Sequence, residues 1–293
     1  MQLLSGKTVS TAVLAQVKES TAGFIRKYGR APSLAVILVG GDPASQTYVA
    51  SKKKAAIALG FGHKDYQLPA TTSQSDLLDI ISGLNNDDSV DGILVQMPLP
   101  AHLDENCVID TIAPEKDVDG FHPINAGKVL LGRPSMISCT PKGVLAILDY
   151  YQISTQGRNV VVLGRSSIVG KPMAALLMQK GRDATVTICH SRTPDIKKHT
   201  LQADILIAAV GRPCMVTADM VKEGAVVVDV GINRIEDSTK KNGWRLVGDV
   251  DYEGVAPHVS AITPVPGGVG PMTIAMLMEN TLIAARRRKG ENA

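Results

Sequence analysis

The sequence predicts an α/β protein with two α/β domains and a C-terminal helix that returns to the first of them. A chain of 293 residues that is 44% hydrophobic can bury two cores at ~150 residues per domain. Two series of apolar strand candidates alternate with helical patterns, which is typical of parallel sheets covered by helices on both faces. A last helical segment carries an apolar stripe that needs a partner surface.

The first series begins with helical spacing of apolar residues over 8–27. The apolar run LAVILVG at 34–40 is rich in β-branched residues and ends in glycine, so it predicts a buried parallel strand. Asp42 and Pro43 then supply an N-cap and a first helical residue for a helix that runs to about Gly60.

The same alternation continues to the end of the first domain, which we place at residues 1–138. A helical pattern at 77–84 precedes a second buried strand at 92–96. A loop-rich segment at 114–141 follows and contains the acidic sequence PEKDVDG. The change from regular alternation to loops marks the domain boundary.

The second domain is predicted at residues 139–263, and residues 264–293 form a glycine loop and a helix that packs back on the first domain. A helical pattern, TPKGVLAILDYY, leads into four strand candidates, NVVVLG, TVTICH, ADILIAAVG and AVVVDVG. The final helix has its apolar stripe at Ile274, Leu277, Met278, Leu282 and Ile283.

The segment NVVVLGRSSIVGKP predicts a dinucleotide site in a Rossmann-like domain. A strand leads into a tight turn at Gly164 and then, past Gly170, into a helix whose N-terminus can hold a pyrophosphate. The pattern departs from G-x-G-x-x-G because Arg165 and Ser166 follow the first glycine, so a plain strand-turn-helix stays open on this motif alone. A P-loop is excluded because Lys171 is followed by proline instead of Ser or Thr.

The end of the next strand favours NADP over NAD. NAD enzymes carry an acidic residue there for the ribose 2′-hydroxyl, whereas this chain has Cys189-His190-Ser191-Arg192. The Ser191 hydroxyl and the Arg192 guanidinium, together with Arg165 from the turn, suit the dianionic 2′-phosphate of NADP. A solvated loop cation is the alternative interpretation of Arg192.

Tyr48 and Lys52 lie one helical turn apart on the helix after Pro43, so one face presents a phenol and an ammonium group. Alone, such a pair is usually surface decoration. The spacing Y-x-x-x-K also marks short-chain dehydrogenases, but there the pair follows the cofactor glycines, whereas here it precedes them. We therefore set that family aside.

Polar residues from two other segments are expected near this pair. Gln96 ends the second buried strand, at the carboxyl edge where open α/β sheets bind ligands. The PEKDVDG loop brings Asp117 and Asp119 to a plausible neighbouring position. A strand-end amide that caps backbone and a turn-forming Asp-Gly are the structural alternatives.

Composition disfavours several other classes of protein. The 31 basic and 28 acidic residues nearly balance at a net charge of +3, and only 3% of residues are aromatic, so no nucleic-acid partner is expected. The histidines and cysteines show no metal-ligand spacing, and we expect no metal. The N-terminus lacks a signal peptide's apolar core and no run is long enough to span a membrane, which predicts a soluble, cytoplasmic protein. Four scattered cysteines are interpreted as reduced, buried small hydrophobes: Cys107, Cys139, Cys189 and Cys214.

Five motifs together resemble those of the methylenetetrahydrofolate dehydrogenase/cyclohydrolase family, in its bacterial FolD form. They are PASQTYVASKKKA, GILVQMPLP, PEKDVDGFHPINAGK, VVLGRSSIVGKP and TPVPGGVGPMT, in this order. The resemblance runs from about Gly6 to Arg287. It implies a homodimer in which a folate substrate binds in a cleft between the first domain and the NADP domain.

The resemblance also implies roles for individual residues. Tyr48 should stack on the folate's aminobenzoyl ring, Lys52 should be the acid-base group that Gln96 positions, and Asp119 should hydrogen-bond the pterin. Further substrate contacts are expected at Val95, Met97, Pro266, Gly267, Gly268, Val269 and Gly270. Cofactor contacts are expected at Gly164, Arg165, Ser166, Ser191, Arg192 and Ile232.

The implied activity is oxidation of 5,10-methylenetetrahydrofolate with NADP, followed by hydrolysis to 10-formyltetrahydrofolate. Hydride transfer needs positioning more than a base, whereas hydrolysis needs proton transfer. A cationic substrate and partial desolvation would favour the neutral form of Lys52, and Gln96 adds no opposing charge. Two alternatives are a dehydrogenase without hydrolysis and a non-catalytic NADP-binding regulator, and the full set of polar residues argues against both.

Overall fold

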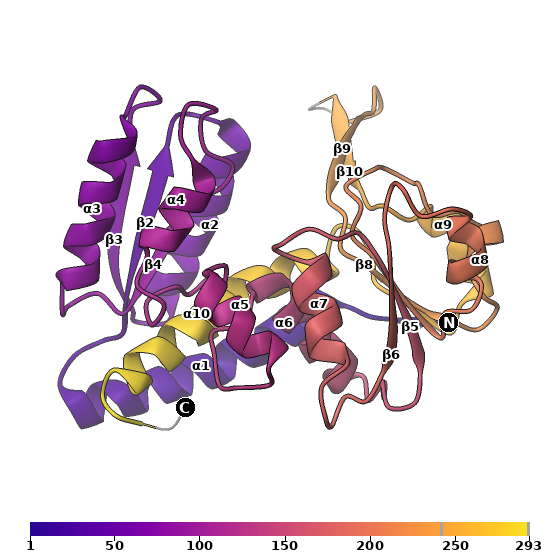
Figure 1. Cartoon of the computed structure of the whole chain (residues 1–293), viewed down its shortest axis with the longest axis horizontal. Helices are drawn as coiled ribbons and strands as arrows, with labels where there is room; N and C mark the ends of the chain where they lie inside the picture. The colour runs from indigo at the N-terminus through magenta and orange to yellow at the C-terminus, as the bar shows by residue number, and fades with distance from the viewer. Residues whose placement is uncertain (241–242, 292–293) are drawn as a thin grey trace. The chain divides into compact units, whose positions relative to one another are not determined.

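The computed structural model describes residues 1–240 and 243–291, and within them the chain forms two compact units, each built on a parallel sheet (Figure 1). The three-stranded unit consists of Thr11–Lys128, Pro134–Cys139 and the residues from Ile274 on. The six-stranded unit consists of Met1–Ser10, Val129–Arg133 and Thr140–Thr273. The predicted α/β class is confirmed.

The three-stranded unit has the strand order β3-β2-β4, with both pairs parallel. Its strands are β2 (Ser33–Val39), β3 (Gly62–Leu68) and β4 (Gly92–Val95). Every residue of β2 and β4 is buried, as expected for apolar runs that carry helices on both faces. The two strands predicted from the sequence are confirmed.

Six helices contribute to the three-stranded unit. They are α1 (Gly6–Tyr28), α2 (Pro43–Ala58), α3 (Gln74–Asn86), α4 (Glu105–Thr111), α5 (Pro123–Leu130) and α10 (Val269–Arg287). Apolar side chains of α3 and α4 share one core cluster with β2 and β4. Helix α2 begins as predicted, because the Asp42 carboxylate accepts a hydrogen bond from Ser45 N at 2.8 Å and Pro43 occupies the first turn.

Some elements of this unit were not predicted. Strand β3 has the polar sequence GHKDYQL and lies at the sheet edge, half-exposed, so it lacks the apolar run that reveals a buried strand. The segment 114–141, expected to be loop-rich, contains α5. Helices of seven and eight residues, as in α4 and α5, are too short to show a clear amphipathic period.

The six-stranded sheet has the order β1-β11-β8-β7-β5-β6, and all of its pairs are parallel. Its strands are β1 (Gln2–Leu3), β5 (Asn159–Leu163), β6 (Thr185–Cys189), β7 (Ile205–Ala208), β8 (Val226–Asp229) and β11 (Ala261–Ile262). A separate antiparallel hairpin pairs β9 (Asn233–Glu236) with β10 (Trp244–Val247). The four predicted strands, β5 to β8, are confirmed.

Short helices cover both faces of the six-stranded sheet; Figure 1 shows α7 on one side of the strands and α8 and α9 on the other. They are α6 (Cys139–Tyr150), α7 (Gly170–Leu177), α8 (Ile196–Thr200) and α9 (Tyr252–Val255), with 3₁₀ turns η1 (Ala218–Met220) and η2 (Ala256–His258). Val161, Leu206 and Val227 from three strands meet Val255 of α9 in one buried cluster. The central strands β5 and β7 are buried on both faces apart from Asn159, as is typical of a parallel sheet covered by helices, whereas the edge strand β6 is partly exposed.

Both sheets contain a point where the chain reverses its direction of winding. Strand β5 pairs with β6 on one side and β7 on the other, and β2 pairs with β3 on one side and β4 on the other. At such a point the loops leave the carboxyl ends of neighbouring strands in opposite directions and open a crevice for a ligand. Ligand binding and chemistry are therefore expected at these two crevices.

No helix in the described residues is long and apolar enough to cross a membrane. The same residues hold no group of three or more His, Cys, Asp or Glu side chains arranged to bind a metal ion. None of the four cysteines, which all lie in the described residues, forms a disulfide bond, and Cys139 and Cys189 are buried as expected. The expectation was wrong for Cys214, which is exposed, and for Cys107, which is only partly buried.

Candidate functional site

Lys52 and Gln96 meet at the carboxyl edge of the three-stranded sheet. The Lys52 Nζ donates a hydrogen bond of 2.9 Å to Gln96 Oε1, and Gln96 Nε2 donates one of 2.7 Å to the Met97 carbonyl oxygen. The second bond fixes the amide so that its oxygen faces the ammonium group. Tyr48, one turn earlier on α2, has a side chain that is 40% exposed, so its ring is accessible to a ligand.

The neighbours of Gln96 serve the fold. Val95 is the last residue of β4, is 3% exposed and pairs with Ile37 of β2. Met97 is partly buried against the same apolar cluster. Both were predicted substrate contacts, and the structure places much of their side-chain surface in or against the core.

Asp119 lies close enough to Lys52 for the two charges to interact. Desolvation raises the pKa of Asp119 to about 6, and the nearby Asp117 carboxylate adds to this, while the Lys52 ammonium and a hydrogen bond from the Cys139 thiol act against it. The structure therefore brings Lys52, Gln96 and Asp119 into one cluster, as the sequence predicted.

The other charged residues of the PEKDVDG segment have structural roles. The buried Asp117 carboxylate accepts hydrogen bonds from the backbone N–H groups of Gly120, Phe121 and His122. The buried Lys116 ammonium donates to three carbonyl oxygens at or just past the C-terminal end of α3, each at 2.8 Å, and burial lowers its pKa. These bonds hold the backbone on which Asp119 is mounted.

Two further residues support Asp119, and the sequence alone did not reveal them. Gly120 has a positive φ of 72°, and a Cβ there would lie 2.5 Å from the backbone of Ile137 and Ser138, so only glycine fits. Asn280 of α10 is buried and donates to the carbonyl oxygens of Val118 and Ile137 at 2.8 and 2.9 Å. The last helix thus contacts the segment that carries Asp119.

The glycine loop 264–270, by contrast, belongs to the six-stranded unit. A Cβ on Gly6 would lie 1.8 Å from the Gly268 carbonyl oxygen, and Lys7 N donates to the Gly267 carbonyl oxygen at 3.0 Å. The loop therefore packs tightly against the start of α1. Of the predicted folate contacts in this loop, Gly268 and Val269 are buried, Pro266 is exposed, and Gly267 and Gly270 are partly accessible.

A second site lies at the carboxyl ends of β5, β6 and β7, where a cavity of about 260 Å³ is lined by Gly164, Arg165, Ser166 and Ser191, among others. A Cβ on Gly164 would lie 2.1 Å from the Ala209 carbonyl oxygen, so glycine is needed where the two strands end side by side. These four residues were all predicted cofactor contacts, and the structure brings them together.

The remaining predicted cofactor residues lie differently. Arg192 is exposed and is absent from the lining of this cavity, whereas Arg212, which the sequence analysis did not single out, is part of it. Ile232 is 43% exposed, and its Cδ1 would lie 3.2 Å from a Cβ placed on Gly270. Arg212 could have been predicted from its position after β7, because β7 pairs with β5, the strand that leads into the turn at Gly164.

Ser166 has an additional structural role at the start of α7. Its hydroxyl accepts hydrogen bonds from Val169 N at 3.1 Å and Gly170 N at 3.3 Å. A Cβ on Gly170 would lie 2.2 Å from the Gly164 carbonyl oxygen, so the second glycine allows the helix to approach the turn. The motif GRSSIVG therefore builds the same close strand-to-helix approach as G-x-G-x-x-G with different residues.

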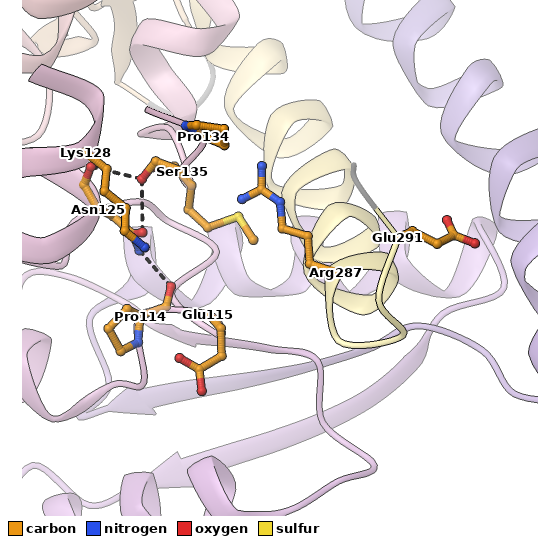
Figure 2. A pocket seen from close by; sticks show the side chains of 9 residues that line it. Pro114, Glu115, Asn125, Lys128, Pro134, Ser135, Arg287 and Glu291 are labelled. Atoms are coloured by element: carbon orange, nitrogen blue, oxygen red, sulfur yellow. Dashed lines mark hydrogen bonds between the residues drawn. The ribbon is translucent and has the colours of Figure 1, made fainter. Parts of the chain in front are cut away.

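A larger cavity of about 550 Å³ lies elsewhere in the three-stranded unit (Figure 2). Asn125 lies beside it and donates to the Pro114 carbonyl oxygen, and the Ser135 hydroxyl donates to the Asn125 side chain, as the dashed lines show. The ionisable residues that line it are two cations and two acids: Lys128, Arg287, Glu115 and Glu291. No predicted site residue lines this cavity, and its balanced charge does not favour an anion.

Comparison with known proteins identifies the family of the chain. The family model described as "Tetrahydrofolate dehydrogenase/cyclohydrolase, catalytic domain" matches residues 4–119, and the model of the family's NAD(P)-binding domain matches residues 138–289. The "Bifunctional protein FolD" of Campylobacter curvus is 57% identical over 288 residues, covering 98% of this chain and 97% of that protein.

Solved structures agree with this assignment. The bifunctional FolD methylenetetrahydrofolate dehydrogenase/cyclohydrolase of Campylobacter jejuni superposes with a TM-score of 0.93 at 49% identity, over 98% of this chain and 99% of the other. The Trypanosoma brucei dehydrogenase-cyclohydrolase, solved with NADP and an inhibitor, gives a TM-score of 0.93 at 40% identity, over 99% and 98% of the two chains. The chain therefore belongs to the tetrahydrofolate dehydrogenase/cyclohydrolase family.

Proposed function

We propose that this enzyme oxidises 5,10-methylenetetrahydrofolate to 5,10-methenyltetrahydrofolate with NADP and then hydrolyses that product to 10-formyltetrahydrofolate. The observation that carries the proposal is the cluster of Lys52, Gln96 and Asp119, with its hydrogen bond of 2.9 Å between Lys52 Nζ and Gln96 Oε1. An ammonium group held by a neutral amide at a ligand crevice is suited to proton transfer. This chemistry is needed in the hydrolysis and would be idle in a pure binding protein.

The oxidation depends mainly on position. NADP supplies the acceptor for the hydride that leaves the methylene carbon between N5 and N10 of the folate. The carbon becomes cationic, and the lone pairs of the two nitrogens stabilise it without help from a base. The task of the protein is orientation, which can by itself supply much of a rate enhancement. Tyr48, with its exposed ring, is proposed to hold the folate's aminobenzoyl group, and Asp119 its pterin.

The hydrolysis requires a group that moves protons. Water adds its oxygen to the cationic carbon and loses one proton, and the bond from that carbon to N5 then breaks. N5 takes up one proton, the hydroxyl oxygen becomes the formyl oxygen on N10, and one proton is released overall. Lys52 is proposed to accept the proton from the attacking water as a neutral amine and, as the ammonium so formed, to donate a proton to N5. Gln96 orients the Lys52 side chain through the hydrogen bond at Oε1.

The residues around the second cavity fit NADP. Gly164 allows close backbone approach, Ser191 offers a hydroxyl, and the Arg165 side chain has no ion pair with any described residue. We propose these three together with Ser166, Arg192 and Ile232 as cofactor contacts, and the loop Pro266–Gly270 with Val95 and Met97 as further substrate contacts. The proposed domains are residues 1–138 for folate, 139–263 for NADP, and 264–293 for the loop and returning helix.

A homodimer and a cytoplasmic location stay predictions. The homodimer is supported by the family resemblance of the chain, and light scattering of the purified protein on a sizing column would test it. Microscopy or fractionation of cells that express the tagged protein would test the location.

The direct test of the proposed function is a coupled absorbance experiment. Purified protein is mixed with 5,10-methylenetetrahydrofolate and NADP, and NADPH and the methenyl intermediate are followed at their separate absorbance bands. The proposal predicts that NADPH accumulates while the methenyl band stays low, because hydrolysis consumes it. NADPH formation with unchecked methenyl accumulation would contradict the second activity, and no NADPH would contradict the first.

A further inference from the structure

Two arginines from different loops line the cavity at the ends of β5, β6 and β7. Arg165 follows β5 and Arg212 follows β7, and Ser191, which follows β6, is in the same lining. Both arginines are exposed to solvent. Arg192, the cation predicted from the sequence to act here, is not among the lining residues. The structure therefore places Arg212, and not Arg192, at this cavity.

The loop that carries Arg212 is held by a buried carboxylate. Asp249 is fully buried, and it accepts hydrogen bonds from the backbone N–H groups of Val210, Gly211 and Arg212 at 2.6, 2.9 and 3.0 Å. Asn233 Nδ2 donates to the same carboxylate at 2.9 Å. Three consecutive N–H groups directed at one acceptor fix the backbone of the loop, so Arg212 is presented to the cavity from a rigid base.

The Asp249 carboxylate is paired with three backbone N–H groups and the Asn233 amide, and it makes no ion pair with the Arg212 guanidinium. Asp249 N itself donates to Asp229 Oδ1 at 2.9 Å, so a second buried carboxylate supports the first. Among residues 1–240 and 243–291, neither Arg165 nor Arg212 makes an ion pair with a carboxylate. The residues that line the cavity include no Asp or Glu. The cavity thus presents two unneutralised guanidinium groups and suits an anion with at least two charges.

Part of the lining of this cavity is apolar. Ile196, Val210 and Met215 line the same cavity and offer a surface for a purine ring. The guanidinium groups are then matched to the phosphate that distinguishes one nicotinamide cofactor from the other, because planar guanidinium binds a phosphate dianion with paired hydrogen bonds. We propose that Arg212 is a second arginine ligand of the 2′-phosphate of NADP, an inference that rests on the proposed use of NADP.

The test measures binding and so does not depend on catalysis. Isothermal titration of the full-length protein with adenosine 2′,5′-bisphosphate and with adenosine 5′-monophosphate compares two probes that differ by the 2′-phosphate. For Arg212→Gln we expect affinity for the bisphosphate to fall ~10-fold or more, the scale of one lost charge-assisted contact. Affinity for the monophosphate should change by less than ~2-fold, because that probe lacks the group in question.

Arg158→Gln is the matched control, because Arg158 is an exposed arginine directly before β5, at the opposite end of that strand from Gly164. It should change neither affinity. Arg212→Lys, which keeps the charge but not the planar fork, should give an intermediate loss and serves if the Gln variant does not fold. Equal losses for the two probes would mean a contact to the adenosine 5′-phosphate portion that they share, and unchanged affinities would mean no contact, so either result overturns the inference. A parent protein that binds both probes equally would instead contradict the proposed use of NADP.

Discussion

The two crevices differ in whether their charged side chains already have partners within the protein. In the three-stranded unit, the charge of Lys52 is already engaged by Gln96 and lies near Asp119. In the six-stranded unit, Arg165 and Arg212 have no carboxylate partner among the described residues, and the acids nearby are engaged by backbone N–H groups. A site that moves protons must hold its donor in place before substrate arrives. A site that binds a polyanion gains more from cations that remain available.

The largest expected effect tests whether the Lys52 region depends on α10. A chain that ends at Pro271 should be insoluble or unfolded, because it loses five large apolar side chains that are at most 3% exposed: Met272, Met276, Leu277, Met278 and Leu282. Each contributes ~1.5 to 3 kcal/mol, so together they rival the ~5 to 15 kcal/mol that stabilises a whole protein. Soluble yield and circular dichroism measure the effect.

The matched control for this truncation is a chain that ends at Gly290. Among the described residues it loses only Glu291, with its salt bridges to Lys27 and Arg286, the hydrogen bond from Tyr28 and the backbone hydrogen bond to Arg286. A surface ion pair of this kind is worth ~0 to 1 kcal/mol. It should fold like the parent. If the chain that ends at Pro271 were soluble and active, α10 would not be needed to build the Lys52 region.

The next effect concerns the available cations of the second crevice. Arg165→Ala should weaken NADP binding by ~10-fold or more, since one charge-assisted phosphate contact is worth ~1.5 to 3 kcal/mol. NAD lacks the 2′-phosphate, so its binding should weaken far less. The KM values of the dehydrogenase reaction for the two cofactors report the difference. Equal losses for NADP and NAD would sink the assignment of Arg165 to the 2′-phosphate.

A smaller effect concerns the free-energy cost of burying the ionised Asp119 carboxylate in the first crevice. Burial raises the pKa of Asp119 from 3.8 to about 6, so between these values the folded protein binds more protons than the unfolded chain. The contribution of Asp119 to the free energy of unfolding should therefore fall as pH rises through this window and stay constant above it. Asp119→Asn removes the penalty, and we expect it to stabilise the protein near pH 8 by about 1 kcal/mol, with weaker folate binding as the counterpart.

Thermal unfolding of parent and Asp119→Asn protein near pH 4 and pH 8 checks this. The difference in melting temperature should be smaller near pH 4, where Asp119 is protonated in the folded protein and only partly ionised in the unfolded chain, and should favour the variant more near pH 8. A variant that is less stable than the parent near pH 8 would show that the ionised carboxylate stabilises the fold, contrary to its raised pKa.

Much of the fold was predictable because its central strands are apolar runs. Strands β2, β4, β5, β7 and β8 are almost wholly buried, and a strand buried on both faces is visible in sequence. Strands β1 and β11 have two residues each, and β3 is a polar edge strand. These elements exist because of their partners in the sheet, which no local pattern records.

The candidate site divides in the same way. Lys52 and Gln96 were predictable because each stands at a recognisable place, one on a helix face and one at a strand end. Asn280 supports the Asp119 segment through a contact that spans 162 positions of the chain, which no spacing rule reveals. Arg212 and Arg192 both follow strands of the same sheet, and only the folded structure shows which of them lines the cavity.

Lys52 is assigned to proton transfer in hydrolysis, and hydride transfer does not need it as a base. Lys52→Met keeps the length of the side chain and removes its proton chemistry. Hydrolysis of methenyltetrahydrofolate should fall ~100-fold or more, the usual scale for general acid-base catalysis, while NADPH formation survives in part and the methenyl band accumulates. Tyr48→Ala is the contrasting variant, because a lost stacking surface should lower both activities together. Each purified variant is followed by NADPH and methenyl absorbance, with circular dichroism to verify folding. A folded Lys52→Met protein that hydrolyses methenyltetrahydrofolate at the parent rate would contradict the assignment of Lys52 as the proton-transfer residue.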